Sequence, residues 1–197
     1  MVLDELSLKK LIEEKLKGNE NRKKHIYQVV ENVKEIIKIE NIEVNSDLYN
    51  KLIASAYLHD IGYSEELNKF NFHAYDGYKY LLDNEYDKSV LKVILHHTYS
   101  ELLYYIQGED RLVITETYNK IPLTSFTKEE DYIFKLLTLA DMKSNSKGEK
   151  VTVADRISDI YDRYGEDSII SKHISQVRLF LILDSKIIDI LNKTVES

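Results

Sequence analysis

Two side chains that commonly bind metal ions stand next to each other at the end of an apolar stretch of this sequence. His59 and Asp60 follow the segment 56–58, and Gly62 comes two residues after them. An imidazole and a carboxylate at the end of a buried helix are costly to desolvate unless something binds them. The position of this pair therefore indicates a ligand site, and a metal ion is a ligand that both side chains suit.

Further candidate ligands are spread along the chain. Five of the six histidines lie between residues 25 and 97, and an aspartate ends another apolar segment. The candidate metal ligands, in chain order, are His25, His59, Asp60, His73, His96, His97 and Asp141. Imidazole and carboxylate together suit Mn, Fe, Co, Ni or Zn, with Mg as a further option, and a carboxylate can bridge two ions. For any one histidine an ordinary hydrogen bond is the simpler explanation. For the whole set we favour a metal site of one or two ions, because otherwise every polar group needs its own partner.

The elements that must position these residues are predicted to be helices. Apolar residues recur at helical spacing, and one proline and six glycines leave few interruptions. We expect helices over about 3–17, 22–39, 48–60, 74–84, 90–107, 128–142, 152–164 and 168–194. Residues 108–127 are predicted to form a long loop or lid with a strand-like piece near 112–114. The candidate ligands then lie near helix ends or on helices with strong apolar faces, so they could converge inside a bundle.

Length and composition restrict the class of protein. With 197 residues the chain is long enough for one well-packed domain, and we expect a single domain over 1–197. The net charge of −7 argues against broad nucleic-acid binding but not against a small anionic substrate beside a metal ion. We expect no membrane span and no secretory signal, which makes the cytoplasm the expected location. The absence of cysteine excludes disulfides and thiolate metal sites.

The order H…HD…H-x-x-x-G…HH…D resembles the HD-domain superfamily of metal-dependent phosphohydrolases. The residues that match it are His25, His59-Asp60, His73 with Gly77, His96-His97 and Asp141. The strings at 57–63, 72–77 and 140–142 are similar to those of small bacterial HD-domain proteins. The resemblance covers about residues 20–148. It implies an all-α, single-domain helical bundle of HD-domain type, with the helices of 152–194 packed on this core.

The resemblance also implies how the ligands are shared. The implied ligands of one metal ion are His25, His59, Asp60 and Asp141. In members with the extra histidines, the implied ligands of a second ion are here Asp60 as a bridge, His73, and His96 or His97.

The sequence does not decide between the two adjacent histidines. Neighbouring residues on a helix point about 100° apart, so only one of His96 and His97 is expected to face the metal ions. Residues 98–100 read Thr-Tyr-Ser, and the chain thus lacks the Gly-Tyr-Pro extension of the cyclic-di-nucleotide phosphodiesterase branch. That branch is therefore not expected.

Hydrolysis at neutral pH needs a nucleophile, which a metal ion supplies by acidifying its bound water. We expect hydroxide held at Asp60 to attack phosphorus, and whichever of His96 and His97 is not a ligand to protonate the leaving group. Arg22 lies on the same helix face as His25 and is a candidate for binding phosphate, with an ordinary solvated arginine as an equal alternative. Lys143 is a weaker candidate, for which a surface position is favoured.

Three other side chains receive no role in this prediction. His173 lies outside the pattern and is expected to be solvated on a helix. Tyr63 and Tyr75 have rings that could stack on a base, but 15 tyrosines make a chance placement the better explanation.

The favoured function is hydrolysis of a nucleotide or another small phosphate ester, a monoester or a diester, with cleavage of a dinucleoside polyphosphate as a related option. The expected partner is therefore a small phosphorylated substrate. One alternative is a di-iron oxygenase of the myo-inositol oxygenase type, which uses the same helical fold. Another is a non-catalytic sensor that binds metal and nucleotide.

The last predicted helix carries more apolar surface than one face needs. Its apolar residues are Ile169, Ile170, Ile174, Val177, Phe180, Leu181, Ile187, Ile188 and Leu191. They either cover the core or pack a homodimer, and covering the core is favoured.

Overall fold

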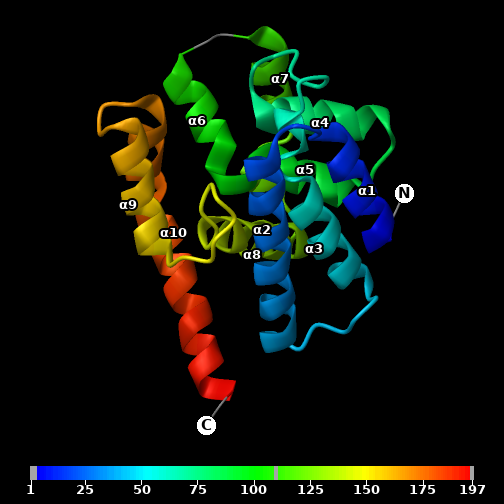
Figure 1. Ribbon diagram of the computed structural model, residues 1–197, viewed down its shortest axis with the longest axis vertical. Coiled ribbons are helices and arrows are strands. Elements are labelled where there is room, and N and C mark those ends of the chain that lie inside the picture. Colours follow the sequence, from blue (N-terminus) through cyan, green and yellow to red (C-terminus); the bar gives the residue numbers. More distant parts are fainter. Residues whose placement is uncertain (1–3, 109–110, 196–197) are drawn as a thin grey trace.

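The computed structural model describes residues 4–108 and 111–195, with 183–195 as backbone only. Its helices are α1 (Glu5–Lys15), α2 (Glu20–Ile39), α3 (Asp47–Leu58), α4 (His73–Asp83), α5 (Lys88–His96), α6 (Ser100–Gln107), α7 (Leu112–Lys120), α8 (Lys128–Met142), α9 (Val153–Tyr164) and α10 (Ile169–Val195) (Figure 1). Short 3-10 turns are η1 (Ile61–Tyr63), η2 (His97–Tyr99) and η3 (Leu123–Ser125). Within the described residues the only extended pairing is an isolated bridge between Ser144 and Lys150, so the predicted all-α class is confirmed. None of the described helices is long and apolar enough to cross a membrane.

Polar side chains explain where several helices begin. Ser46 accepts a hydrogen bond from the backbone N–H of Tyr49 at the start of α3. Thr127 and Glu130 form a reciprocal capping box at the start of α8, as the sequence predicted. A side-chain cap of this kind contributes about 1 kcal/mol by satisfying a backbone N–H that the helix leaves unpaired.

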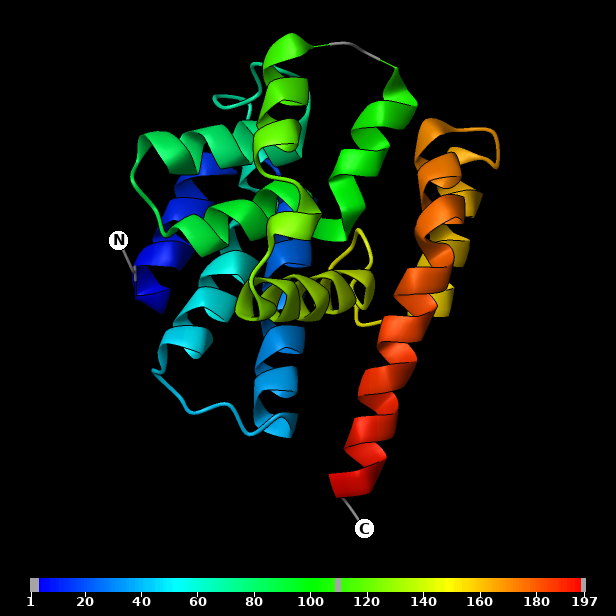
Figure 2. The same cartoon turned by 180° about the vertical axis from the view of Figure 1, so that it is seen from behind.

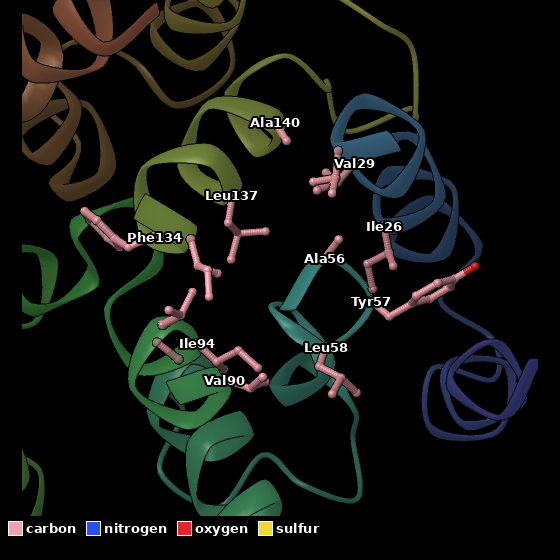
Figure 3. Packing of buried hydrophobic residues seen from close by; sticks show 14 of the residues in the cluster. Ile26, Val29, Ala56, Tyr57, Leu58, Val90, Ile94, Phe134, Leu137 and Ala140 are labelled. Atoms are coloured by element: carbon pink, nitrogen blue, oxygen red, sulfur yellow. The ribbon is translucent and has the colours of Figure 1, made fainter. Parts of the chain in front are cut away.

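The core lies where α2, α3, α5 and α8 meet (Figure 3). The four helices direct buried apolar side chains at one another, among them Ile26, Val29, Ala56, Leu58, Val90, Ile94, Leu137 and Ala140. Each large side chain buried in this way contributes roughly 1.5–3 kcal/mol to folding. The same helices carry candidate ligands at or near their ends, and the packing of the core therefore fixes how those ligands approach one another.

Helices α9 and α10 pack against each other along one side of the bundle, beside α6 and α8 (Figures 1 and 2). The buried face of α10 carries Ile174, Val177 and Leu181. Phe180 is 56% exposed, while Ile187, Ile188 and Leu191 lie outside the residues whose side chains are described. One face of α10 thus covers the bundle, and the homodimer stays a prediction.

The segment 108–127 is not the long loop that we expected from its mixed composition. Residues 112–120 form α7, and η3 follows Pro122. The buried face of α7 consists of Ile114 and Tyr118, four residues apart, while Leu112 and Val113 are exposed. A face of two side chains is too short to reveal the helical period, and for this reason the strand-like interpretation of 112–114 was wrong.

The single helix expected over 90–107 is also interrupted. Thr98 and Tyr99 have positive φ angles of 51° and 58°, so α5 ends at His96 and α6 starts at Ser100. Left-handed backbone costs about 1–3 kcal/mol at a residue other than glycine and persists only where the surroundings hold it. Neither residue type signals such a turn, because chains usually place glycine or asparagine there.

Candidate metal centre

Three buried histidines are fixed by backbone carbonyl groups. In each of them Nδ1 lies 2.6–3.1 Å from a backbone oxygen: His25 on Asn145, His59 on Ala56 and His97 on Ile94. A carbonyl oxygen only accepts, and so Nδ1 must carry the proton and donate it. In the neutral ring Nε2 then has a free lone pair. This is the arrangement in which proteins present histidine to a metal ion.

The free nitrogens of two of these histidines face one oxygen of Asp60. Nε2 lies 3.6 Å from Asp60 Oδ2 in His25 and 3.3 Å in His59. The carboxylate of Asp141 joins them, with its Oδ1 3.0 Å from His25 Nε2. His25, His59 and Asp60 offer ligand atoms that all lie within 4.8 Å of one another. These four residues form the first group of the candidate metal centre.

The other oxygen of Asp60 faces a second group. Nε2 of His73 and Nε2 of His97 each lie 3.7 Å from Asp60 Oδ1 and 3.2 Å from each other. Asp60, His73 and His97 again have ligand atoms within 4.8 Å of one another. One carboxylate therefore presents an oxygen to each group, which is the geometry of a bridging ligand.

These separations fit the ligand shell of a transition-metal ion. Two ligands about 2.0–2.1 Å from a tetrahedral ion lie about 3.3 Å apart, and the ligand atoms above lie 3.0–3.7 Å apart. Nε2 of His59 is buried and has no hydrogen-bond partner among the described residues. A buried polar atom of this kind usually has a partner, and a metal ion would supply it. The residues present therefore fit a metal ion in each group.

The charges at the site suit metal binding as well. Burial raises the pKa of the Asp60 carboxyl, but the positive charge of Arg22 opposes burial and this pKa is held well below its usual range. Burial also raises the pKa of the Asp141 carboxyl, but the contact with the His25 imidazole outweighs burial and lowers this pKa below its usual range. Burial lowers the pKa of His73 to about 3. At neutral pH both carboxylates are thus ionised and His73 is neutral, the states in which these three side chains bind a metal ion. Burial lowers the pKa of His59, but the charge of Asp60 outweighs burial and raises this pKa, so a metal ion would displace a proton from His59.

Two glycines allow His73 to approach the His59-Asp60 pair. A Cβ on Gly62 would lie 2.0 Å from the backbone oxygen of His73 and 2.6 Å from the nitrogen of Gly77. No side chain fits at such distances, and only glycine lets η1 pack against the first turns of α4. The glycine of the H-x-x-x-G pattern, Gly77, lies on the other side of this contact.

The segment 144–148 is held against α2 by a third glycine. Gly148 has a φ of 78°, and a Cβ there would lie 2.6 Å from the backbone oxygen of Lys24. This close approach brings the carbonyl of Asn145 onto Nδ1 of His25. The segment after α8 is therefore part of what orients the first group.

Arg22 forms an ion pair with Asp60, the carboxylate that the two groups share. Its Nη1 is 2.5 Å from Asp60 Oδ2, and its guanidinium carbon is 3.9 Å from the ring centroid of Tyr63. The Tyr63 ring also stacks on His73 with a centroid distance of 4.3 Å. Two groups at about 4 Å from one ring centroid must lie on opposite faces, so both faces of Tyr63 are occupied by protein.

Two of the candidate residues are placed away from the two groups. His96 has its Nε2 2.7 Å from the backbone oxygen of Ile121, and its ring packs against Tyr118 and Phe126. Lys143 is the C-cap of α8 and does not contribute to the cavity lining in the described part of the chain. Of the two adjacent histidines, His97 is thus the one that the structure brings to Asp60.

His173 is not the solvated residue that we expected. It is 3% exposed, its Nε2 lies 3.1 Å from the backbone oxygen of Tyr99, and it lines a cavity beside the candidate metal centre. The prediction was wrong because His173 precedes Ile174 on the face of α10 that packs on the bundle.

A cavity of about 140 Å³ opens beside the two groups. One part of its lining comes from the candidate centre: Arg22, Asp60, His73, His97 and Asp141. The other part comes from α9 and α10 and includes Arg156, Arg163, Tyr164 and His173. Sequence reasoning missed the residues of α9. The available signal was the spacing of Arg156, Ile160 and Arg163, which lie on one helical face.

The fold is an all-helical bundle in which histidines and an aspartate gather around a shared carboxylate to form a candidate metal centre. Residues 22–167 match the model of the HD domain, and the chain therefore belongs to the HD-domain family, a superfamily of metal-dependent phosphohydrolases. This confirms the family that the sequence motifs suggested. The match extends past residue 148 and includes α9. Searches of curated proteins and of solved structures found no match.

Proposed function

We propose that this protein is a metal-dependent phosphohydrolase that acts on a nucleotide or another small phosphate ester. The main observation in support of this proposal is the orientation of His25, His59 and His97. Each donates Nδ1–H to a backbone carbonyl, which leaves Nε2 free beside an ionised carboxylate. Membership of the HD-domain family supports the same conclusion.

The two groups described above would hold the metal ions. The first would use His25, His59, Asp60 and Asp141, and the second would use Asp60, His73 and His97. Mn, Fe, Co, Ni or Zn suits these donors, with Mg as a further option. When bound, the metal supplies an acidified water as nucleophile and neutralises charge on the phosphoryl oxygens.

Arg22 would bind and orient the reacting phosphate. Arg22 is held between Asp60 and the ring of Tyr63, so its guanidinium is fixed at the cavity wall before substrate arrives. We leave Lys143 out of the proposed substrate contacts because it lies apart from this lining. His96 donates to Ile121 within an aromatic cluster, and we assign it no part in protonating the leaving group.

The charge of the cavity favours a phosphate ester over the neutral polyol of the oxygenase alternative. Three arginines contribute to its lining, although the whole chain has a net charge of −7. Guanidinium groups match the geometry of phosphate oxygens and form charge-assisted hydrogen bonds with them. A neutral polyol carries no negative charge that could pair with Arg156 and Arg163.

The test is a substrate panel assayed for phosphate release after reconstitution with each candidate metal. Nucleoside monophosphates, nucleoside diphosphates, phosphodiesters and an aryl phosphate cover the ester classes. Metal-dependent release from at least one class is the expected result. Metal binding without any turnover would support the sensor instead, and oxygen consumption by the iron-loaded protein would support the oxygenase.

A further inference from the structure

Two arginines of α9 line the cavity beside the candidate metal centre and share one carboxylate. Arg156 Nη1 lies 3.1 Å from Asp159 Oδ2. Arg163 reaches the same oxygen with Nε at 3.0 Å and Nη2 at 2.8 Å. The side chain of Arg156 is 12% exposed and that of Arg163 is 32% exposed. Both guanidinium groups are therefore held in place at the cavity by their own helix.

The pairing of Arg156 and Arg163 with a single carboxylate leaves a net positive charge. Asp159 supplies one negative charge against the two positive charges of Arg156 and Arg163. In addition, Nε of Arg156 is buried without a hydrogen-bond partner among the described residues. Arginine carries five N–H donors and no acceptor, so an incompletely paired and largely buried guanidinium is a binding site for an anion.

The candidate metal centre does not involve the charge of Arg156 and Arg163. Its own arginine, Arg22, is paired with Asp60, and its candidate ligands come from α2, α4 and α8 and from the residues that directly follow α3 and α5. The arginines of α9 reach the same cavity from a different element. A ligand whose reacting phosphoryl group lies at Asp60 therefore meets a second cationic group elsewhere in the lining.

We propose that Arg156 and Arg163 form a second anion subsite, and that the substrate carries a further phosphate beside the one that reacts. The substrate class is thus a diphosphate or polyphosphate ester, a refinement that rests on the function proposed above. The cavity volume of about 140 Å³ agrees with this. Sites that enclose a whole drug-sized ligand measure roughly 300–1,000 Å³, so this one accommodates the phosphate end of a substrate.

The first test compares a nucleoside diphosphate with the monophosphate of the same nucleoside. Arg163→Gln should lower kcat/KM for the diphosphate by about tenfold or more, the effect of losing a charge-assisted hydrogen bond, and should change the monophosphate by less than about threefold. Arg156→Gln is the second variant, in case one of them folds poorly. Arg178→Gln is the matched control, because Arg178 is exposed on α10 away from the cavity lining.

The second test measures binding without turnover. Calorimetric titration of the metal-loaded protein with inorganic pyrophosphate and with orthophosphate should give tighter binding of pyrophosphate, and Arg163→Gln should remove most of that preference. Metal content is measured after each titration, because pyrophosphate can extract metal ions.

The outcomes separate the two proposals. Equal losses for both ligands, or no change for either, would overturn the second subsite even if the protein hydrolyses phosphate esters. If the wild-type protein hydrolyses none of the esters, the proposed function fails. The pyrophosphate preference and its loss in Arg163→Gln would then still establish the subsite.

Discussion

Thr98 donates a hydrogen bond of 2.6 Å from its Oγ1 to Oδ2 of Asp141. Thr98 holds a left-handed backbone conformation with a φ of 51° at the break between α5 and α6. Its hydrogen bond fixes one oxygen of a carboxylate whose other oxygen lies 3.0 Å from His25 Nε2. The strained turn thus orients a proposed metal ligand, which gives a physical reason for the interruption of the helix.

Removal of this hydroxyl should weaken metal binding. We expect Thr98→Val to raise the dissociation constant for the metal by about tenfold, within the range found for residues that orient metal ligands. Thr98→Ser keeps the hydroxyl and should bind nearly as tightly as the wild type. Titration of the metal-free proteins with Mn²⁺ measures the difference. Equal affinities for the two variants would show that the hydrogen bond does not position Asp141.

The two adjacent histidines should respond differently to substitution. His97→Ala removes a proposed ligand of the second group, and we expect the metal content to fall from two ions per chain toward one. His96→Ala should keep the metal content and lose about 1–3 kcal/mol of stability, because it removes the donor to Ile121 and a buried ring. Elemental analysis and chemical denaturation give the two readouts. Loss of metal in His96→Ala with full content in His97→Ala would reverse our assignment.

His173 should make the metal-free protein less stable as the pH falls. Burial lowers its pKa from the ordinary value of 6.5. The unfolded chain therefore binds the proton more readily than the folded protein does. The contribution of His173 to the free energy of unfolding is complete above pH 6.5 and is lost as the pH decreases from there toward the lower pKa of the folded state. The free energy of unfolding then falls by at most about 1.4 kcal/mol per pH unit.

The check is urea denaturation of the wild type and of His173→Gln at several pH values below 6.5, in the presence of a chelator. Glutamine can still donate to the backbone oxygen of Tyr99 but does not titrate. The variant should therefore show a smaller loss of stability on acidification. Parallel curves for the two proteins would mean that His173 does not contribute to the pH dependence.

Gly62 should tolerate no side chain. A Cβ 2.0 Å from the backbone oxygen of His73 must push η1 and α4 apart. We expect Gly62→Ala to lose at least about 2 kcal/mol of stability and to bind less metal at His73. Gly18→Asn is the control, because Gly18 has a positive φ with open space around it and asparagine accepts that conformation. The account of the H-x-x-x-G contact is wrong if both variants keep the stability of the wild type.

The sequence predicted the elements with long apolar faces and the residues at their ends. The apolar stripe of α2 and the N-cap residues of α3 and α8 predicted the bounds of these helices to within a few residues. The candidate ligands His25, His59, Asp60, His73, His97 and Asp141 do come together, because they lie near the ends of helices whose core packing is strong. Their roles as ligands remain predictions.

The features that the sequence did not predict depend on tertiary contacts. The choice between His96 and His97 depends on the turn at Thr98 and Tyr99, which no glycine or proline announces. The short helix α7 is defined by only two buried side chains. The arginines of α9 reach the cavity only because α9 and α10 pack beside α6 and α8 (Figure 2).

The most direct test is the metal content of the protein, because every proposed role of Asp60 depends on metal ions bound by both of its oxygens. Wild-type protein and Asp60→Ala are stripped with a chelator, reloaded with Mn²⁺ or Zn²⁺, dialysed and analysed for metal per chain. We predict about two ions per chain in the wild type, and close to none in a folded Asp60→Ala, which also lacks phosphate release. A wild-type protein that takes up no metal, or an Asp60→Ala variant that retains the same content, would contradict the account.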